Sequence, residues 1–222
     1  MTDHISPTQF SASEGVEDWR VLGDGACAFF RTGSFGEGAR LVQAIGELPG
    51  VEDHHPDVDL RHDGVTVRLV TDADGYFGMS RRDAVLASQI SAAARKLGLS
   101  ADPSAVQSLL FIPGAPARAE VMPFWRAVLG YEPRQDSPDE DLVDPHSRGT
   151  PFWLEQMKEP RPDGGGAIHV AVWVPYEQAE ARVAAALAAG GRMVRDEFAP
   201  SWWTLADAWG NEADIATIKG RD

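Results

Sequence analysis

The sequence predicts an α+β fold, and three observations support this class. Residues 65–70 alternate apolar and polar side chains, as in a strand with one wet face. Apolar residues at helical spacing follow at Ala87, Ile90, Ala94 and Leu97. The second half of the chain repeats a strand and helix order at about fifty residues, which suggests two similar modules packed as a pair.

The first half is expected to run strand, helix, two strands, helix. Residues 27–31 form a short apolar strand, and an apolar helical face from Phe35 to Ile45 ends at Pro49-Gly50. Residues 72–79 are expected to be a glycine-bearing loop. Ser80 and Asp83 then resemble a capping box, with Asp in the usual Glu position, and open a helix that Gly98 ends.

Residues 99–104 include Pro103 and are expected to be a linker between domains at 1–99 and 105–222. Beyond it, strands are predicted at 106–112 and 168–174. Each precedes an apolar helical pattern that ends in glycine, and a Pro/Gly-rich break lies at 160–166. Further strands up to Met157, and closing strands at 202–205 and 213–218, complete the two modules.

Composition narrows the function classes. The 222 residues carry a formal net charge of −14, which argues against nucleic acid and against an anionic membrane surface. No apolar run approaches the roughly 18 residues that span a bilayer, and residues 1–10 do not resemble a signal peptide. Cys27 is the single cysteine, so a cytoplasmic setting is expected. A small molecule or a protein remains as the partner.

Two adjacent histidines, His54 and His55, followed by Pro56 and Asp57, are the most informative motif. Imidazole is the side chain best matched to proton transfer near neutral pH. In isolation such a pair is most simply an exposed, inert loop. The surrounding residues favour an active site instead, with Asp57 and Pro56 as candidate substrate-binding residues and Asp57 as a hydrogen-bond partner for an imidazole. His62 is expected in a solvated turn.

Residues 53–57, the strand at 65–70, Thr71 and the segment Ser80-Arg81-Arg82-Asp83 resemble pterin-4a-carbinolamine dehydratases over about residues 15–98. The resemblance implies a small sheet backed by helices and a 4a-hydroxytetrahydrobiopterin substrate that loses water to give the quinonoid dihydropterin. It implies His54 and His55 as the acid and base, and it requires no metal or organic cofactor. Asp83 is interpreted as a helix cap rather than as a catalytic acid.

The motif departs from the resembled family at Asp72, which occupies the position of that family's third histidine, and at Val58, where that family often has an aromatic residue. A carboxylate near His54 or His55 would stabilise imidazolium. Three interpretations stay open: Asp72 replaces the third histidine as a base, it orients a neighbouring imidazole, or the site is degenerate and serves binding or folding. The hypothesis is reduced but real dehydratase activity.

The second half resembles the vicinal oxygen chelate superfamily of glyoxalase and bleomycin-resistance-like proteins over about residues 105–219. The segments that carry the resemblance are 124–131 and 203–212, with Ala208 where a Pro is usual. It implies paired βαβββ modules that form a cleft. The positions that match a metal site are Gln107, Glu155, His169 and Asp214.

Those four residues would suit a divalent ion such as Zn, Ni, Mn or Fe. The alternative is that Gln107 and Glu155 are ordinary polar residues of a wet cleft and that His169 is hydrogen-bonded at a module interface. The tryptophans of this half are expected in the core, although Trp153, Trp173 and Trp202 could line the cleft.

Three functions follow in order of preference: a dehydratase fused to a glyoxalase-like domain, a metal-dependent lyase, isomerase or dioxygenase acting through the second half, and a binding protein without catalysis. The expected partner is a small-molecule pterin. The first resemblance also implies a homo-oligomer, unless the fused domain covers the surface used for self-association.

Overall fold

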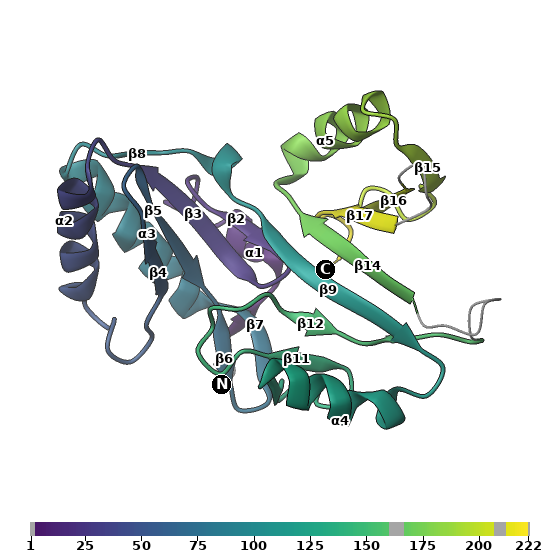
Figure 1. Cartoon of the computed structure of the whole chain (residues 1–222). Coiled ribbons are helices and arrows are strands. Elements are labelled where there is room, and N and C mark those ends of the chain that lie inside the picture. The colour runs from purple at the N-terminus through teal and green to yellow at the C-terminus, as the bar shows by residue number, and fades with distance from the viewer. Residues whose placement is uncertain (1–2, 160–166, 207–211, 222) are drawn as a thin grey trace. The chain divides into compact units, whose positions relative to one another are not determined.

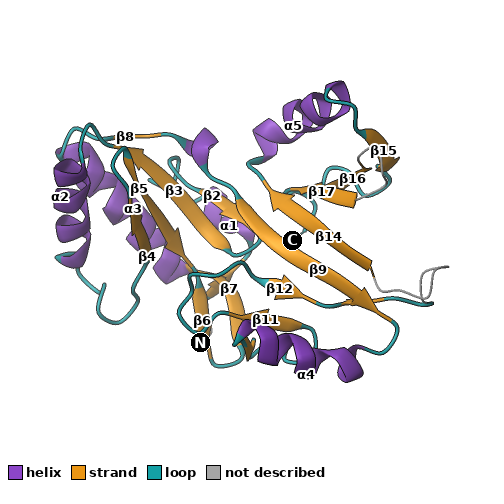
Figure 2. Cartoon of the chain, in the orientation of Figure 1, coloured by secondary structure: helices purple, strands orange, loops and turns teal. Residues whose placement is uncertain are grey.

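The computed structural model describes residues 3–159, 167–206 and 212–221. Helices and several antiparallel and mixed sheets form the chain, so the predicted α+β class is confirmed (Figure 2). The chain divides into two compact units. One consists mainly of residues up to 73 with 77–106, and the other mainly of residues 107–220.

The N-terminal unit is built on an antiparallel sheet with the strand order β2-β3-β5-β4. These strands are β2 (Arg20–Leu22), β3 (Gly25–Arg31), β5 (Gly64–Leu69) and β4 (Asp57–Leu60). Helices α2 (Phe35–Gly46) and α3 (Arg81–Lys96) lie beside this sheet (Figure 1). The predicted order of strand, helix, two strands and helix is therefore present.

Alternation along the strands places an apolar face under the helices. Phe30 on β3 and Val65, Val67 and Leu69 on β5 are at most 1% exposed, while the residues between them on β5 are half-buried. The indole of Trp19 donates hydrogen bonds to the Ala87 carbonyl and to Ser91 Oγ, both 3.1 Å away. Helix α3 is thus fixed by apolar burial and by a buried polar contact.

A second, three-stranded sheet orders the region before α3. It consists of β1 (His4–Ile5), β7 (Tyr76–Ser80) and β6 (Thr71–Ala73), and α1 (Pro7–Ser11) follows β1. The prediction of a loop at 72–79 is wrong, because β6 and β7 pair with each other over most of this segment. Asp74 and Gly75 connect the two strands, with φ values of 55° and 73°. Asp-Gly with two positive φ angles is the preferred two-residue connection of a tight hairpin.

The predicted linker at 99–104 is also ordered. β8 (Ser100–Ala101) pairs with β3, and a 3₁₀ turn at Pro103–Ala105 follows, with the Asp102 side chain as its cap. The backbone N–H of Asp102 donates to the Phe29 carbonyl. The segment therefore extends the first sheet instead of forming a free connection.

The C-terminal unit contains two βαβββ modules in one nine-stranded sheet of the described residues. The first module has β9 (Ser108–Ala115), α4 (Arg118–Leu129), β10 (Glu132–Pro133), β11 (Asp141–Val143) and β12 (Phe152–Trp153), and β13 (Glu155–Gln156) also pairs with β9. The second has β14 (Ala167–Trp173), α5 (Tyr176–Ala188), β15 (Arg192–Arg195), β16 (Trp202–Ala206) and β17 (Glu212–Ala216). Antiparallel pairing of β9 with β14 joins them.

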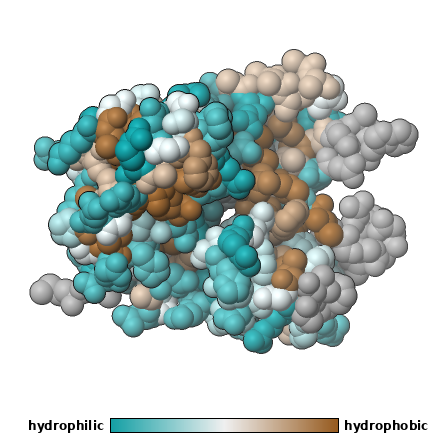
Figure 3. Space-filling model, turned by 60° about the vertical axis from the view of Figure 1, so that its left-hand side comes forward, coloured by the Kyte–Doolittle hydropathy of each residue, from teal (hydrophilic) through white to brown (hydrophobic). Residues whose placement is uncertain are grey.

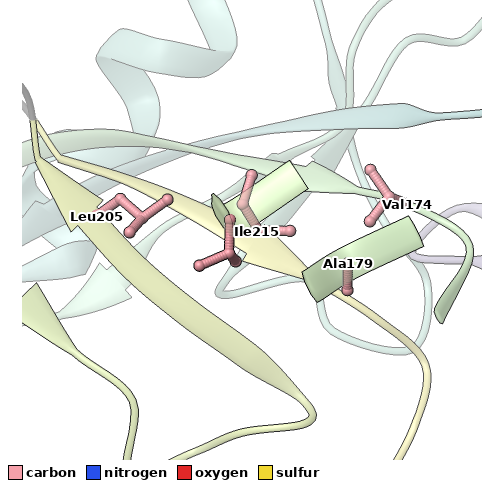
Figure 4. Close-up of a cluster of buried hydrophobic side chains, with 5 residues drawn as sticks. Val174, Ala179, Leu205 and Ile215 are labelled. Carbon is pink, nitrogen blue, oxygen red and sulfur yellow. The ribbon is translucent and has the colours of Figure 1, made fainter. Parts of the chain in front are cut away.

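The helices of this unit cover one face of its sheet. Val174, directly after β14, packs together with Ala179 of α5, Leu205 of β16 and Ile215 of β17 (Figure 4). A corresponding cluster of Ala115, Leu142, Phe152 and Leu154 packs against α4. Asp214 precedes the core residue Ile215 on β17, so its side chain points to the other face of the sheet. On β14, Ala171 pairs with Asp214, and His169 lies two residues before Ala171. His169 and Asp214 therefore share the face that is opposite the core.

Two predicted features lie wholly or partly outside the described residues, namely the break at 160–166 and residues 207–211 of the segment 203–212. Among the described helices, none has the length and apolar character needed to cross a membrane. On the face seen in Figure 3, hydrophilic residues predominate and hydrophobic residues gather in patches between them.

Gly25 supplies a test of this fold. Its φ is 135°, and an added Cβ would lie 2.5 Å from the Leu69 backbone oxygen, so Gly25→Ala would strain the start of β3. We expect a loss of about 1–3 kcal/mol in unfolding free energy, measured by urea denaturation. Gly36→Ala is the matched control, because nothing lies within 4 Å of its Cβ position in α2. Equal midpoints for both variants would contradict the assigned β3 geometry.

Candidate functional site

His54 lies in the loop between α2 and β4 and contacts the first turn of α3. Its Nε2 atom is 2.7 Å from Oδ1 of Asp83. The His54 side chain is 16% exposed and that of Asp83 is 0% exposed. A backbone hydrogen bond from His54 N–H to the Gly50 carbonyl, 3.0 Å long, holds the loop at this position. The imidazole is therefore anchored at one nitrogen by a buried carboxylate.

Asp83 receives further hydrogen bonds on its other oxygen. Oδ2 accepts from the backbone N–H of Ser80 at 2.7 Å, and it lies 2.8 Å from the hydroxyls of Ser80 and Thr71. The first contact belongs to the capping box of α3, in which the Asp83 backbone N–H also donates to Ser80 Oγ at 3.4 Å; the sequence predicted this box and the structure confirms it. The Thr71 hydroxyl connects strand β6 to the same carboxylate. Both oxygens of the buried carboxylate are therefore hydrogen-bonded, as is usual for buried polar groups.

These contacts fix the charge of Asp83. Burial alone would raise the pKa of its carboxyl, but hydrogen bonds from His54, Thr71 and Ser80 outweigh burial and lower the pKa. The ionised carboxylate can only accept hydrogen bonds, so His54 Nε2 must carry the proton. In the neutral imidazole, Nδ1 then holds the free lone pair. The arrangement is that of an oriented general base.

A pocket of about 620 Å³ opens beside His54. This volume falls within the range typical of small-molecule sites. Its walls come from the loop after α2, from one face of α3 and from Asp3, and the remaining lining residues are Pro49, Gly50, Asp53, Arg81, Arg82, Val85, Leu86 and Gln89. The lining combines charged and polar side chains with an apolar strip from Val85 and Leu86, a combination suited to a flat, polar-edged ring.

The other predicted site residues take different positions. His55 is exposed, and it precedes Pro56, which favours extended backbone at His55. Asp72 is exposed on β6, directly after Thr71. Strand alternation points the Asp72 side chain away from the face on which Thr71 meets Asp83. Neither His55 nor Asp72 lines the pocket beside His54.

Asp57 does not serve as the expected imidazole partner. It opens β4, where Arg68 Nε on the adjacent β5 donates to Asp57 Oδ2 at 3.1 Å. Arg68 Nη1 also donates to the Asp24 carbonyl at 2.9 Å. The expectation for Asp57 is corrected on this point, because cross-strand register places a guanidinium opposite it. His62 lies exposed in the turn between β4 and β5, as expected.

In the C-terminal unit, two of the four predicted metal ligands contact each other. His169 Nε2 lies 3.4 Å from Asp214 Oδ2, and Thr204 donates to Asp214 Oδ1 at 2.6 Å. Burial lowers the pKa of His169, but the bond to Asp214 and the charges of Asp214, Glu155 and Glu212 outweigh burial and raise it.

The remaining predicted ligands are less well placed. Gln107 Oε1 accepts from Arg182 at 3.4 Å, and Glu155 acts on His169 through its charge. Across the described ranges, no three His, Cys, Asp or Glu side chains form a group that could hold a metal ion. The residues as placed do not fit a bound metal, and the metal set stays a prediction.

The role of Asp83 as the partner of His54 was missed from the sequence, as was that of Thr71. The two paired residues are 29 positions apart, so no local spacing reveals their contact. The available signal was the Asp in the capping box. In this chain the Asp that stands in the usual Glu position of the box also contacts His54, beyond the helix end.

Comparison with known proteins divides the chain in the same way. Residues 4–93 match the family model described as Pterin 4 alpha carbinolamine dehydratase, and residues 111–216 match the model described as Glyoxalase-like domain. A putative pterin-4-alpha-carbinolamine dehydratase of Nocardia farcinica is 35% identical over 95 residues, which cover 42% of this chain and 98% of that protein.

Two further relatives carry the same name. The one from Mycobacterium leprae is 33% identical over 76 residues, which cover 34% of this chain and 78% of the relative. The one from Mycolicibacterium smegmatis is 38% identical over 58 residues, which cover 26% of this chain and 60% of the relative. The similarity to these relatives is thus confined to part of the chain.

The buried carboxylate predicts a pH dependence of stability. Because folding lowers the pKa of Asp83, its contribution is present above the unfolded carboxyl pKa and is lost as pH falls through the folded pKa. Asp83→Asn should cost about 2–3 kcal/mol near neutral pH. It should also make the decline in unfolding free energy below about pH 5 shallower than in the parent.

Urea denaturation at a series of pH values measures both effects. Asp74→Asn, at an exposed turn residue whose φ of 55° suits Asn, is the matched control and should follow the parent. If the unfolding free energy of Asp83→Asn and of the parent declined in parallel as pH falls, these contacts would not be what keeps Asp83 ionised.

Proposed function

We propose, from the premise that the chain belongs to the pterin-4a-carbinolamine dehydratase family through residues 4–93, that its N-terminal unit removes water from a 4a-hydroxytetrahydropterin. The observation that carries this proposal is the His54–Asp83 pair at the edge of a pocket of about 620 Å³. A histidine oriented by a buried carboxylate and open to a ligand-sized pocket is suited to proton transfer.

The reaction is a balanced elimination. The C4a–O bond breaks and the oxygen leaves as water after gaining one proton. The N5–H bond gives up its proton, and its electron pair forms the new C4a=N5 double bond of the quinonoid dihydropterin. The protein therefore needs a base near N5 and an acid near the departing hydroxyl, with no change of oxidation state.

His54 is proposed as the base. Its Nε2–H donates to Asp83, so Nδ1 can accept the N5 proton. The Asp83 carboxylate, 2.7 Å from Nε2, lies against the imidazolium that forms in this step. Asp83 is a positioning residue, because it acts on the substrate only through His54.

His55 is proposed as the acid that protonates the departing hydroxyl. It adjoins His54 in the chain, and its exposure lets it exchange protons with solvent after each turnover. Because Asp83 already orients His54, Asp72 is not needed for that task. We propose that the absence of a third imidazole at position 72 lowers the rate.

The role of His54 is tested by a dehydration assay with 4a-hydroxytetrahydropterin on the full chain. His54→Ala should lower kcat by about 10²–10⁴-fold, which is the usual contribution of a general base. Asp83→Asn should lower kcat with a smaller effect on KM, and it should shift the pH profile, because the imidazole loses its orienting carboxylate.

His62→Ala is the matched control for His54→Ala, since His62 lies exposed in the turn between β4 and β5. Its kcat should equal that of the parent. A parent chain without dehydration above the uncatalysed rate would refute the proposed function, whereas equal losses in His54→Ala and His62→Ala would refute only the role of His54.

The role of Asp72 is tested separately. Asp72→His restores an imidazole at this position and should raise kcat by about tenfold, within the range of acid–base contributions. Asp72→Asn should not raise it, because it removes the charge without adding a proton-transfer group. Unchanged activity in both variants would show that Asp72 does not take part in the reaction.

A further inference from the structure

Gln89 contains a polar atom that the fold leaves without a partner. Its Oε1 atom is buried and accepts no hydrogen bond from any described residue. Buried side-chain oxygens are normally paired, so an orphan acceptor calls for an explanation. Gln89 also lines the pocket that contains His54, so a ligand there is a candidate donor.

The position of Gln89 on α3 fits a ligand that reaches from His54. Asp83, which holds His54, lies six residues earlier on the same helix, a separation of about 9 Å at 1.5 Å per residue. Val85 and Leu86 lie between them along the helix and line the same pocket. A bicyclic ring with hydrogen bonds at both ends matches a polar group at each end of an apolar wall.

The proposed substrate offers such an arrangement. Its reacting atoms, C4a and N5, are next to the ring junction, while the pyrimidine ring carries a 2-amino donor on its outer edge. An amide oxygen accepts hydrogen bonds from amino groups, and the last torsion of a glutamine side chain turns readily. With N5 at His54, the amino edge would extend along the wall towards Gln89.

We infer that Gln89 is a specificity-determining residue whose amide oxygen accepts a hydrogen bond from the 2-amino group of the pterin. This inference rests on the proposed function and deepens it. This hydrogen bond distinguishes a 2-amino-4-oxo ring from a 2,4-dioxo ring, which presents an acceptor in place of the donor. Sites built around a substrate hydrogen bond reject analogues that lack it, because a buried polar group is then left unpaired.

Equilibrium binding to the full chain tests the inference, with 7,8-dihydropterin and its 2-oxo analogue as the two probes. Gln89→Met keeps the length of the side chain and removes the amide. It should weaken dihydropterin binding by about tenfold, as expected for the loss of one hydrogen bond, and leave the Kd of the 2-oxo analogue nearly unchanged. Its thermal midpoint should equal or exceed that of the parent, because the buried Oε1 atom that it removes has no hydrogen-bond donor among the described residues.

Gln43→Met is the matched control, since Gln43 lies exposed on α2 and bonds only to Glu47 among the described contacts. It should bind both probes as the parent does. Gln89→Glu is a second variant, which retains an acceptor and should keep the preference for the 2-amino probe. This variant preserves the test if Gln89→Met folds poorly.

The possible results separate the two proposals. A parent that dehydrates the carbinolamine but shows no change in dihydropterin Kd with Gln89→Met would overturn the role of Gln89 alone. Equal weakening of both probes would also overturn it, since this would indicate altered packing instead of recognition of the amino group. A parent that neither dehydrates the carbinolamine nor binds dihydropterin would overturn the proposed function together with this inference.

Discussion

The carboxylate of Asp83 is the constraint on which the N-terminal site depends. It joins three segments: the loop carrying His54, the strand β6 through Thr71, and the start of α3 through Ser80. A buried charge is costly unless it is hydrogen-bonded, so these segments must come together for the unit to fold. The same requirement that caps the helix also fixes the orientation of the imidazole, which links stability to chemistry in one group.

A related arrangement recurs in the C-terminal unit, on a different fold. Asp214 is held by the Thr204 hydroxyl and lies against the imidazole of His169. In both units a hydroxyl and an imidazole share a buried carboxylate that neighbouring elements position. The difference lies in the surroundings. Glu155 and Glu212 add negative charge around His169, whereas the pocket beside His54 is lined by Asp3 and Asp53 as well as by Arg81 and Arg82.

Local patterns predicted much of the fold, and distant contacts account for what was missed. The alternation at 65–70 and the Ser80 capping box gave β5 and the start of α3 because both signals are local. Asp74-Gly75 was also a local signal for the β6–β7 hairpin, but it was interpreted as a loop. The His54–Asp83 pair and the orphan oxygen of Gln89 depend on packing between distant segments, which no spacing in one sequence reveals.

The most direct test of this account is the tautomer of His54, measured by ¹⁵N NMR of the imidazole in the full chain at a pH where the ring is neutral. A protonated Nε2 and an unprotonated Nδ1 are expected, because the Asp83 carboxylate accepts from Nε2. Asp83→Asn should weaken this preference. A parent protein with the proton on Nδ1 would contradict the account, since the proposed base would then have no lone pair directed at the substrate.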